Sequence, residues 1–286
     1  MTLIELEHEA SRRLGQQGVT DTPDLEARLL MQKATGLDEV GLITHRFDAL
    51  DDTARHMFGT LLGQRLSGRP MAYILGHRGF YDLDFTVDER VLIPQPDTET
   101  LVEDVLRTTK ADPDLAILDL CTGSGCIGIT LAKHLGCHVT LSDLSEDALK
   151  VAGINAKRWL DEGQYTLVHS DLFEQISGTF DLIVSNPPYL TKEWIKEASE
   201  EVRREPVMAL DGLGRDGLAI IRRLASQVRA HLAPSGRVWI ECDYRQAATV
   251  RTLLLANGCL SVYIEKDLAG KDRVVVGATD HVRAAD

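Results

Sequence analysis

Hydrophobic residues recur at helical spacing through the first seventy residues of the chain. The first run has four of them, three or four positions apart: Leu3, Leu6, Ala10 and Leu14. A second run begins at residues 22–23, where proline follows threonine, and a third follows the aspartates at 51 and 52. The pattern predicts a helical domain over residues 1–71. Its residues include no cluster typical of a catalytic or metal-binding site, so we interpret it as a packing or recognition unit.

Residues 72–93 show a different pattern. Residues 72–76 and 80–87 are predicted as two short strands around the polar turn His77-Arg78-Gly79, which makes this segment a β-hairpin linker. The stretch that follows, residues 91–100, is extended and leads into a helix with Asp97 or Thr98 as its N-cap. Two interpretations of this stretch stay open: a linker with a capping box, or a strap across the mouth of an active site.

From residue 116 onward, strand and helix patterns alternate. Short hydrophobic runs predict strands at residues 116–120, 138–143, 165–169, 180–184, 237–241, 259–265 and 273–277. Strands that alternate with helices form parallel sheets. The last two strands are joined by a short turn and must therefore pair antiparallel, because a parallel crossover needs a dozen or more residues. The predicted core is an α/β fold, in which a mostly parallel sheet has one reversed strand near its edge.

Composition and charge narrow the class of protein. The chain has 286 residues, of which 44% are hydrophobic and 26% charged, as in soluble globular proteins. No run approaches the length of a membrane span, and the N-terminus is acidic and unlike a signal peptide. The five cysteines include no Cys-x-x-Cys pair, which favours reduced thiols in the cytoplasm over disulfides or zinc. A net charge of −13 argues against a protein that grips long nucleic acids.

A glycine-rich turn follows the first of these strands. Its residues are Cys121, Thr122, Gly123, Ser124 and Gly125. Glycines allow the backbone to approach a ligand and to turn sharply into a helix whose N-terminal N–H groups face that ligand. With Gly128, the spacing matches the Gly-x-Gly-x-x-Gly fingerprint of nicotinamide enzymes, which therefore have to be considered. Asp119, just before the turn, is more typical of S-adenosylmethionine sites.

Acidic residues end the next two strands. Asp143 follows the second strand, where a carboxylate can accept both ribose hydroxyls of an adenosine. Asp171 and Leu172 follow the third strand, where they can hold the adenine amino group and cover the ring. Ligands bind beyond the carboxyl ends of strands in open α/β sheets. The sequence therefore predicts a nucleoside cofactor.

The fourth strand ends in Asn186, Pro187, Pro188 and Tyr189. The Asn186 side chain offers an acceptor and a donor in one plane, which matches a planar amide or an amino-purine. The prolines fix the backbone so that neighbouring carbonyl groups point outward, and Tyr189 offers a flat face for stacking. A simple strand-ending turn is the alternative interpretation.

Together these motifs resemble class I S-adenosylmethionine-dependent methyltransferases that act on planar nitrogen. A fuller set is similar to the release factor glutamine methyltransferases, the PrmC/HemK family, and spans essentially the whole chain. Its segments are residues 93–99, 119–125, 186–189, 201–203, 205–206, 216–217 and 267–273. The resemblance implies a seven-stranded Rossmann-like methyltransferase domain over residues 94–286, and a helical substrate-recognition domain before it. There are two departures: the family usually has Arg where Gln95 stands, and a glycine-containing run is commoner at residues 241–243.

The resemblance also implies a reaction. S-adenosyl-L-methionine would methylate the side-chain amide nitrogen of the glutamine in the Gly-Gly-Gln motif of class 1 peptide chain release factors. Asn186, Pro187 and Tyr189 would be catalytic, and Asn186 through Tyr189 would bind the substrate. No metal, membrane or direct nucleic acid contact is expected, and the protein is expected to be a cytoplasmic monomer.

Three alternatives remain. An amino-group methyltransferase acting on adenine or guanine in nucleic acid would use Asn-Pro-Pro-Tyr equally well. The negative net charge of the chain and the lack of an inserted basic segment argue against this alternative. A dehydrogenase has no use for that motif. A non-catalytic module on the same fold would not need the full motif set.

Overall fold

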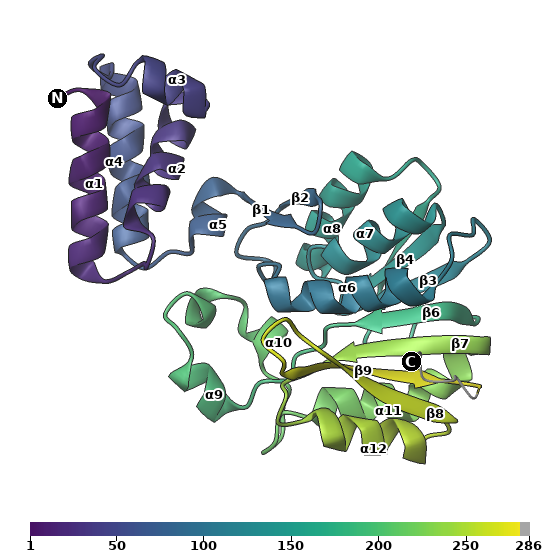
Figure 1. Ribbon diagram of the computed structural model, residues 1–286. Coiled ribbons are helices and arrows are strands. Elements are labelled where there is room, and N and C mark those ends of the chain that lie inside the picture. The colour runs from purple at the N-terminus through teal and green to yellow at the C-terminus, as the bar shows by residue number, and fades with distance from the viewer. Residues whose placement is uncertain (281–286) are drawn as a thin grey trace. The chain divides into compact units, whose positions relative to one another are not determined.

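The computed structural model describes residues 1–280, and the chain divides into two compact units. Unit 1 comprises residues 1–77 together with 199–204, and unit 2 comprises residues 78–198 and the chain from 205 onward. Figure 1 colours both by residue number. The sequence did not predict that residues 199–204 belong with the N-terminal helices.

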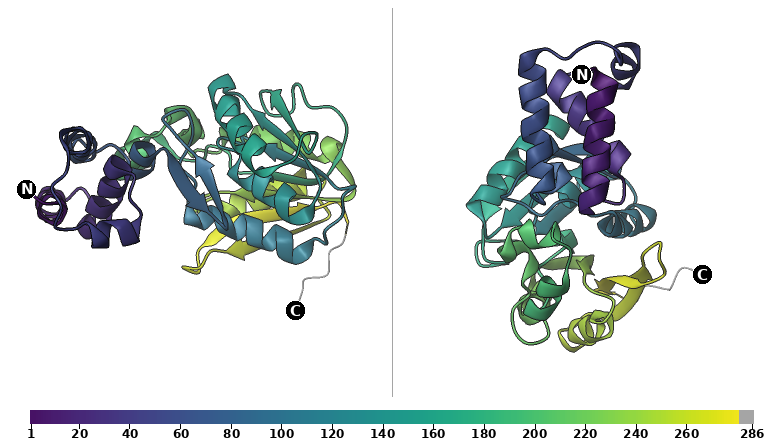
Figure 2. Two further views of the ribbon diagram at one scale, coloured as in Figure 1. Left: turned by 90° about the horizontal axis from the view of Figure 1, so that it is seen from above. Right: turned by 90° about the vertical axis from the view of Figure 1, so that its left-hand side faces the viewer.

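Unit 1 is helical, as predicted. Its helices are α1 (Leu3–Gln17), α2 (Pro23–Thr35), α3 (Glu39–Thr44), α4 (Asp52–Leu66) and α5 (Met71–Leu75). The long helices α1, α2 and α4 lie alongside one another (Figures 1 and 2), and they bury Leu3, Ala10 and Leu14 of the first hydrophobic run, with Leu6 partly buried, whereas Leu25 of α2 and Met57 of α4 are exposed. Thr2 and Glu5 form a capping box at the start of α1, and Asp51 caps α4 by accepting from the backbone N–H of Ala54.

A buried arginine holds unit 1 together. Arg65 of α4 is 1% exposed and donates to both carboxylate oxygens of Glu26 at 2.6 and 3.1 Å. Its guanidinium also donates to the carbonyl oxygen of Val19 at 2.7 Å and pairs with Glu201 at 2.5 Å. Because Glu201 lies in the segment 199–204, this ion pair helps to place that segment in unit 1.

The predicted strand at residues 72–76 is wrong, because this segment forms helix α5. A short hydrophobic run fits a buried helical turn as well as a strand, and periodicity alone cannot distinguish them. Here Ala72, Tyr73 and Ile74 are all buried, and Gly76 ends the helix in a left-handed conformation with φ 81°. The hairpin itself exists, but its strands are β1 (His77–Phe80) and β2 (Leu83–Thr86), so its turn lies later in the chain than predicted.

The helix after the predicted strap begins one residue before the predicted caps. Helix α6 spans Pro96–Thr108, and its N-cap is Gln95, which makes no side-chain cap hydrogen bond. Proline at the first helical position sets the start of α6 without such a cap, because its missing N–H would have no helical partner there. Asp97 and Thr98 are therefore wrong as N-caps, and their side chains are available for other contacts.

Unit 2 is built on a seven-stranded sheet with the order β5-β4-β3-β6-β7-β9-β8. The strands are β3 (Ala116–Leu120), β4 (His138–Asp143), β5 (Tyr165–His169), β6 (Phe180–Ser185), β7 (Leu232–Glu241), β8 (Ser261–Lys266) and β9 (Asp272–Ala278). Strands β3 to β7 pair in parallel, and β9 runs antiparallel to both of its neighbours. The predicted α/β sheet with one reversed strand near its edge is confirmed.

Helices cover both faces of this sheet (Figure 1). One face packs against α6, α7 (Cys126–Leu135) and α8 (Glu146–Trp159), and the other against α11 (Ala219–His231) and α12 (Ala247–Ala256). Two short helices, α9 (Lys192–Glu197) and α10 (Val207–Leu210), lie in the connection between β6 and α11. The result is a three-layer doubly wound fold, in which the carboxyl ends of β3, β4, β5 and β6 share one edge.

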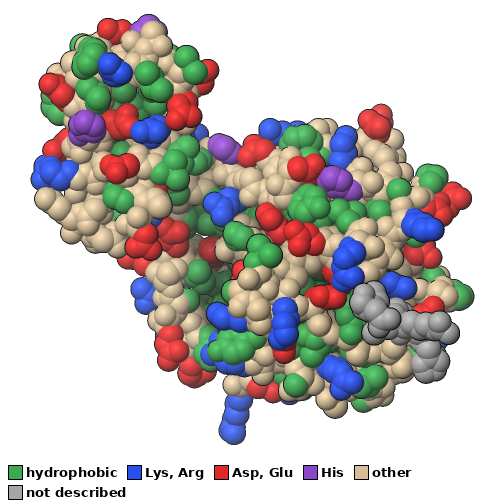
Figure 3. All heavy atoms as spheres, viewed as in Figure 1, with side chains coloured by type: hydrophobic (Ala, Val, Ile, Leu, Met, Phe, Trp, Pro, Cys, Tyr) green, Lys and Arg blue, Asp and Glu red, His purple; other side chains and the backbone are tan. Residues whose placement is uncertain are grey.

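Acidic, basic and hydrophobic side chains are interspersed over the face shown in Figure 3. That face is a mosaic and not the continuous basic surface that long nucleic acids require. All five cysteines are free thiols, and four of them are buried. Within residues 1–280 no helix combines the length and the hydrophobicity that crossing a membrane would require.

Candidate active site

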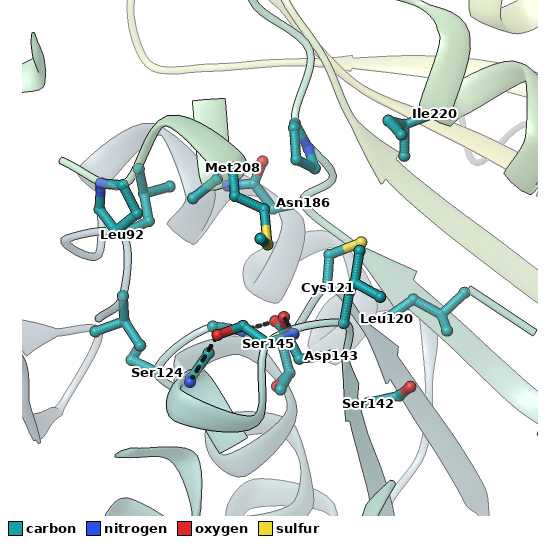
Figure 4. Close-up of a pocket in the computed structure, with 18 of the residues that line it drawn as sticks. Leu92, Leu120, Cys121, Ser124, Ser142, Asp143, Ser145, Asn186, Met208 and Ile220 are labelled. Carbon is teal, nitrogen blue, oxygen red and sulfur yellow. Dashed lines mark hydrogen bonds between the residues drawn. The ribbon is translucent and has the colours of Figure 1, made fainter. Parts of the chain in front are cut away.

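A cavity of about 390 Å³ opens at the carboxyl ends of β3 to β6 in unit 2. Figure 4 shows it with Asp143, Ser145 and Cys121 on one side and Asn186 and Met208 on the other. Most of the predicted cofactor residues line it: Cys121, Thr122, Gly123, Ser124, Asp143, Asp171, Leu172 and Asn186. The fold thus brings four strand ends, which are distant in sequence, around one space large enough for a small-molecule ligand.

The glycine turn between β3 and α7 bends sharply into the helix, as its residues predicted. Gly123 has φ 55°, and a side chain built on it would meet nothing within 4 Å, so the turn presents bare backbone. Gly125, the residue before α7, has φ 84°, and a Cβ there would lie 2.6 Å from Ile129. Gly125 does not line the cavity, so glycine is required here for the tight entry into α7.

Asp119 lies under this turn and is fully buried. Its Oδ2 accepts from the Thr122 hydroxyl at 2.6 Å and from the backbone N–H of Gly128 at 2.9 Å. Burial raises the pKa of Asp119 to about 7, although both hydrogen bonds oppose the rise. Asp119 does not line the cavity, so its carboxyl group acts on the turn from below.

Asp143 ends β4 and faces the cavity directly. Its two oxygens accept from the backbone N–H groups of Gly123 at 2.9 Å and Ser145 at 2.8 Å. Ser145 itself caps α8 by accepting from the N–H of Ala148. Burial raises the pKa of Asp143, and the backbone N–H groups oppose that rise. Since a carboxylate has about four lone-pair sites, about two remain for a ligand.

Asp171 and Leu172 follow β5 and line the cavity. The Asp171 carboxylate accepts from Arg223 of α11 at 2.9 Å, a partner that no sequence pattern predicted. Leu172 is 5% exposed and has φ 51°, which is uncommon for a leucine and places its side chain against the cavity.

The four residues after β6 are divided between the cavity and the protein interior. Asn186 and Pro188 line the cavity, whereas Pro187 and Tyr189 do not. The Asn186 Nδ2 donates to the Thr98 hydroxyl oxygen at 3.3 Å, and the Tyr189 hydroxyl donates to Glu241 at 3.1 Å. Burial raises the pKa of Tyr189 well above its usual value, so it is a neutral donor.

The backbone of this segment is held by close packing from the chain around residues 211–217. Gln246 of α12 donates from Nε2 to the carbonyl oxygens of Tyr189 and Asp216, both at 2.8 Å. A Cβ on Gly217 would lie 2.3 Å from the Tyr189 carbonyl oxygen, and a Cβ on Gly212 would lie 2.7 Å from the Tyr189 Cα. Two glycines and one glutamine therefore fix the position of Asn-Pro-Pro-Tyr.

Further residues line the cavity. Residues 90–95 do so, most of them in the first part of the stretch 91–100 that was interpreted either as a linker or as a strap, and the backbone N–H of Ile93 donates to Glu205 at 2.8 Å. Val207 and Met208 of α10 line it too, although both are 60% exposed, and Met208 extends toward the space in Figure 4. No local pattern marked Val207 and Met208, because they reach the cavity only through the long connection after β6.

Two protein-family models match the chain. The PrmC N-terminal domain matches residues 5–76, and the methyltransferase small domain matches residues 96–210. The first match falls on the helices of unit 1, and the second on the glycine turn, Asp143 and Asn-Pro-Pro-Tyr.

Curated relatives match over nearly the full length. The release factor glutamine methyltransferase of Bordetella pertussis is 38% identical over 89% of this chain and 94% of its own. That of Caulobacter vibrioides is 36% identical over 97% of this chain and 96% of its own. Among solved structures, a methyltransferase from Pyrococcus furiosus superposes with a TM-score of 0.53 at 19% identity, covering 70% of this chain and 91% of its own. That structural likeness establishes the fold.

Proposed function

This chain belongs to the family of release factor glutamine methyltransferases, and we propose that it methylates the side-chain amide nitrogen of a release factor glutamine with S-adenosyl-L-methionine. The observation that supports this most directly is the placement of Asn186 and Asp143 across one cavity. A site that binds a nucleoside on one side thereby presents a planar amide partner on the other.

The cavity residues fit S-adenosylmethionine. Asp143 has lone pairs left for a ribose diol, and the bare backbone at Gly123 gives room above the turn. Asp171 would accept from the adenine amino group, and Leu172 would cover the ring. When bound, the cofactor supplies an electrophilic methyl group on a positively charged sulfur.

The protein's own part in the reaction is to orient the glutamine amide. An amide nitrogen is a poor nucleophile, because its lone pair is delocalised into the carbonyl group. The Asn186 side-chain oxygen and the Pro187 carbonyl would accept its two N–H groups and fix the plane of the nitrogen, while Pro188, which lines the cavity, would pack against the flat amide. Such positioning supplies roughly 7–11 kcal/mol in favourable cases.

Unit 1 would hold the release factor. The match to the N-terminal domain model covers its helices, and its surface includes exposed hydrophobic side chains such as Val40, Ile43 and Phe47 on and just after α3. The acidic net charge disfavours the alternative of an amino-group methyltransferase on nucleic acid. We propose a cytoplasmic monomer that acts on class 1 release factors.

The test is transfer of labelled methyl groups from S-adenosylmethionine to three acceptors: an intact release factor, its Gln→Ala variant at Gly-Gly-Gln, and duplex DNA. Label on the intact release factor alone is the expected result. Label on DNA, or equal label on the Gln→Ala variant, would refute the assigned substrate.

Asn186→Ala tests the site itself. Losing the amide that orients the substrate should lower turnover by about a thousandfold, as for removal of one preorganised catalytic dipole. Affinity for S-adenosylhomocysteine, measured by calorimetry, should fall only modestly, because Asp143 and the glycine turn remain. Near-normal turnover in this variant would contradict the assignment.

A further inference from the structure

Asn186 can serve the proposed reaction in only one of its two amide orientations. Its oxygen must face the substrate, because the glutamine nitrogen brings two N–H donors. The oxygen and the NH2 group are nearly the same size, so their hydrogen-bond partners decide which way the amide lies. In this structure Nδ2 donates to Thr98 Oγ1 at 3.3 Å, which turns Oδ1 the other way.

Thr98 alone cannot impose this orientation. A hydroxyl group both donates and accepts, so it would satisfy a flipped amide by donating to Oδ1. Thr98 favours the productive orientation only if its own proton is directed elsewhere. Thr98 lies in the first turn of α6 and is 1% exposed, so water cannot readily take that proton.

The neighbouring acceptor is Glu241, whose pKa the Thr98 hydroxyl lowers. This residue ends β7, is 2% exposed, and receives the Tyr189 hydroxyl on Oε1. Its Oε2 is buried without a hydrogen-bond partner among the described residues, which leaves lone pairs for the Thr98 hydroxyl. Buried carboxylate oxygens are rarely left unpaired, because an unmade hydrogen bond there is costly.

We propose that Thr98 and Glu241 are positioning residues that fix the Asn186 amide with its oxygen toward the substrate. The inference rests on the proposed function and deepens it: Glu241 accepts the Thr98 proton, so Thr98 can only accept from Asn186. The same carboxylate holds Tyr189, so one buried group organises both ends of Asn-Pro-Pro-Tyr.

The arrangement is sensitive to pH. Burial raises the pKa of Glu241 to about 7, against the lowering effects of Thr98, Arg273 of β9 and Tyr189, while Asp97 of α6 raises it further. Above that pH the ionised carboxylate accepts from Thr98. Below it, the protonated carboxyl can donate to Thr98, whose own proton is then free to attract Asn186 Oδ1 and flip the amide.

The first variant is Thr98→Val, which keeps the shape of the side chain and removes the hydroxyl. Turnover should fall about 10- to 100-fold, the range for a mispositioned reacting group. The Kd for S-adenosylhomocysteine and the unfolding temperature should stay near those of the wild type. Thr98→Ser should restore most of the turnover. The matched control is Thr130→Val, because Thr130 is equally buried, on α7, and its hydroxyl has no hydrogen-bond partner among the described residues.

A second readout reports the amide orientation itself. Release factor with Gln→Glu at Gly-Gly-Gln is used as a competitive inhibitor, because its carboxylate lacks N–H groups. The wild type should bind the glutamine form about tenfold or more tightly than the glutamate form. The glutamate carboxylate would leave the accepting oxygens of the site without N–H partners, and sites reject ligands that leave buried polar groups unpaired. In Thr98→Val the preference should shrink. The turnover of the wild type should fall between pH 8 and pH 6, and Glu241→Gln should abolish this fall.

Unchanged turnover and unchanged preference in Thr98→Val would overturn the inference. A parallel loss of S-adenosylhomocysteine affinity or of unfolding temperature would also overturn it, because Thr98 would then have a structural role. If wild-type protein leaves the release factor unmethylated, the proposed function fails and the inference fails with it. Failure of the Thr98 variants alone leaves the proposed function standing.

Discussion

Asp143→Asn is the substitution whose effect on cofactor binding can be worked out most fully from the structure. The carboxylate already accepts from the N–H groups of Gly123 and Ser145, at 2.9 and 2.8 Å. Asp143 lines the cavity, and we propose that its two remaining lone-pair sites accept the two ribose hydroxyls. An asparagine has only one accepting oxygen, and its NH2 group would oppose one of the backbone N–H donors.

The loss follows from the number of charged hydrogen bonds. Each is worth about 1.5–3 kcal/mol, and the variant loses at least one of them while weakening the second. A net loss of about 3 kcal/mol corresponds to roughly 100-fold weaker binding at 25 °C, since each 1.4 kcal/mol is tenfold. The effect should appear in Kd more than in turnover at saturating cofactor, because Asp143 lies at the cofactor end of the cavity.

The assay is calorimetric titration with S-adenosylhomocysteine and with its 2′-deoxy and 3′-deoxy analogues. The wild type should lose affinity for each deoxy analogue, whereas Asp143→Asn should discriminate much less among the three ligands. Asp147→Asn is the matched control, because Asp147 is an exposed aspartate at the start of α8. Binding by Asp143→Asn within threefold of the wild type, in a protein that unfolds normally, would refute the ribose contact.

Two further substitutions test how the site and unit 1 are held. Gly217→Ala should lower turnover about 100-fold with little change in cofactor affinity, because the new Cβ would lie 2.3 Å from the Tyr189 carbonyl oxygen. Gly214→Ala is the matched control, because Gly214 has φ 74° and Gly217 has φ 70°, but a Cβ on Gly214 would have no atom closer than 3.7 Å. Equal loss of turnover in both variants would contradict this reasoning. Arg65→Met should destabilise unit 1 by about 3–5 kcal/mol in denaturant unfolding, because it leaves the buried Glu26 carboxylate unpaired. Arg28 forms only exposed ion pairs, so Arg28→Ala should leave the free energy of unfolding almost unchanged. A loss in Arg28→Ala as large as that in Arg65→Met would contradict this reasoning.

The sequence alone determined two kinds of feature. These are the helices and strands, whose hydrophobic residues recur at regular spacing, and the turns, which depend on the backbone freedom of single residues. Alternating strand and helix patterns predicted the doubly wound sheet, and the short link between the last two strands predicted the reversed strand β9. The glycine turn and the residues after β6 were recognised because ligands bind where parallel strands end. Membership of the family followed from the same motifs and is confirmed by the curated relatives.

The tertiary structure decided which distant residues meet. Thr98 and Glu241 contact Asn186 and Tyr189 from α6 and β7, and nothing in the local pattern of either segment marks that meeting. The segment 72–76 became a helix because burial on several sides overrides a short, ambiguous run. Residues 199–204 joined unit 1 through Arg65, an ion pair between positions far apart in the chain. Local periods and turn residues report backbone conformation, whereas such contacts depend on the packing of whole elements, so only the folded chain defines them.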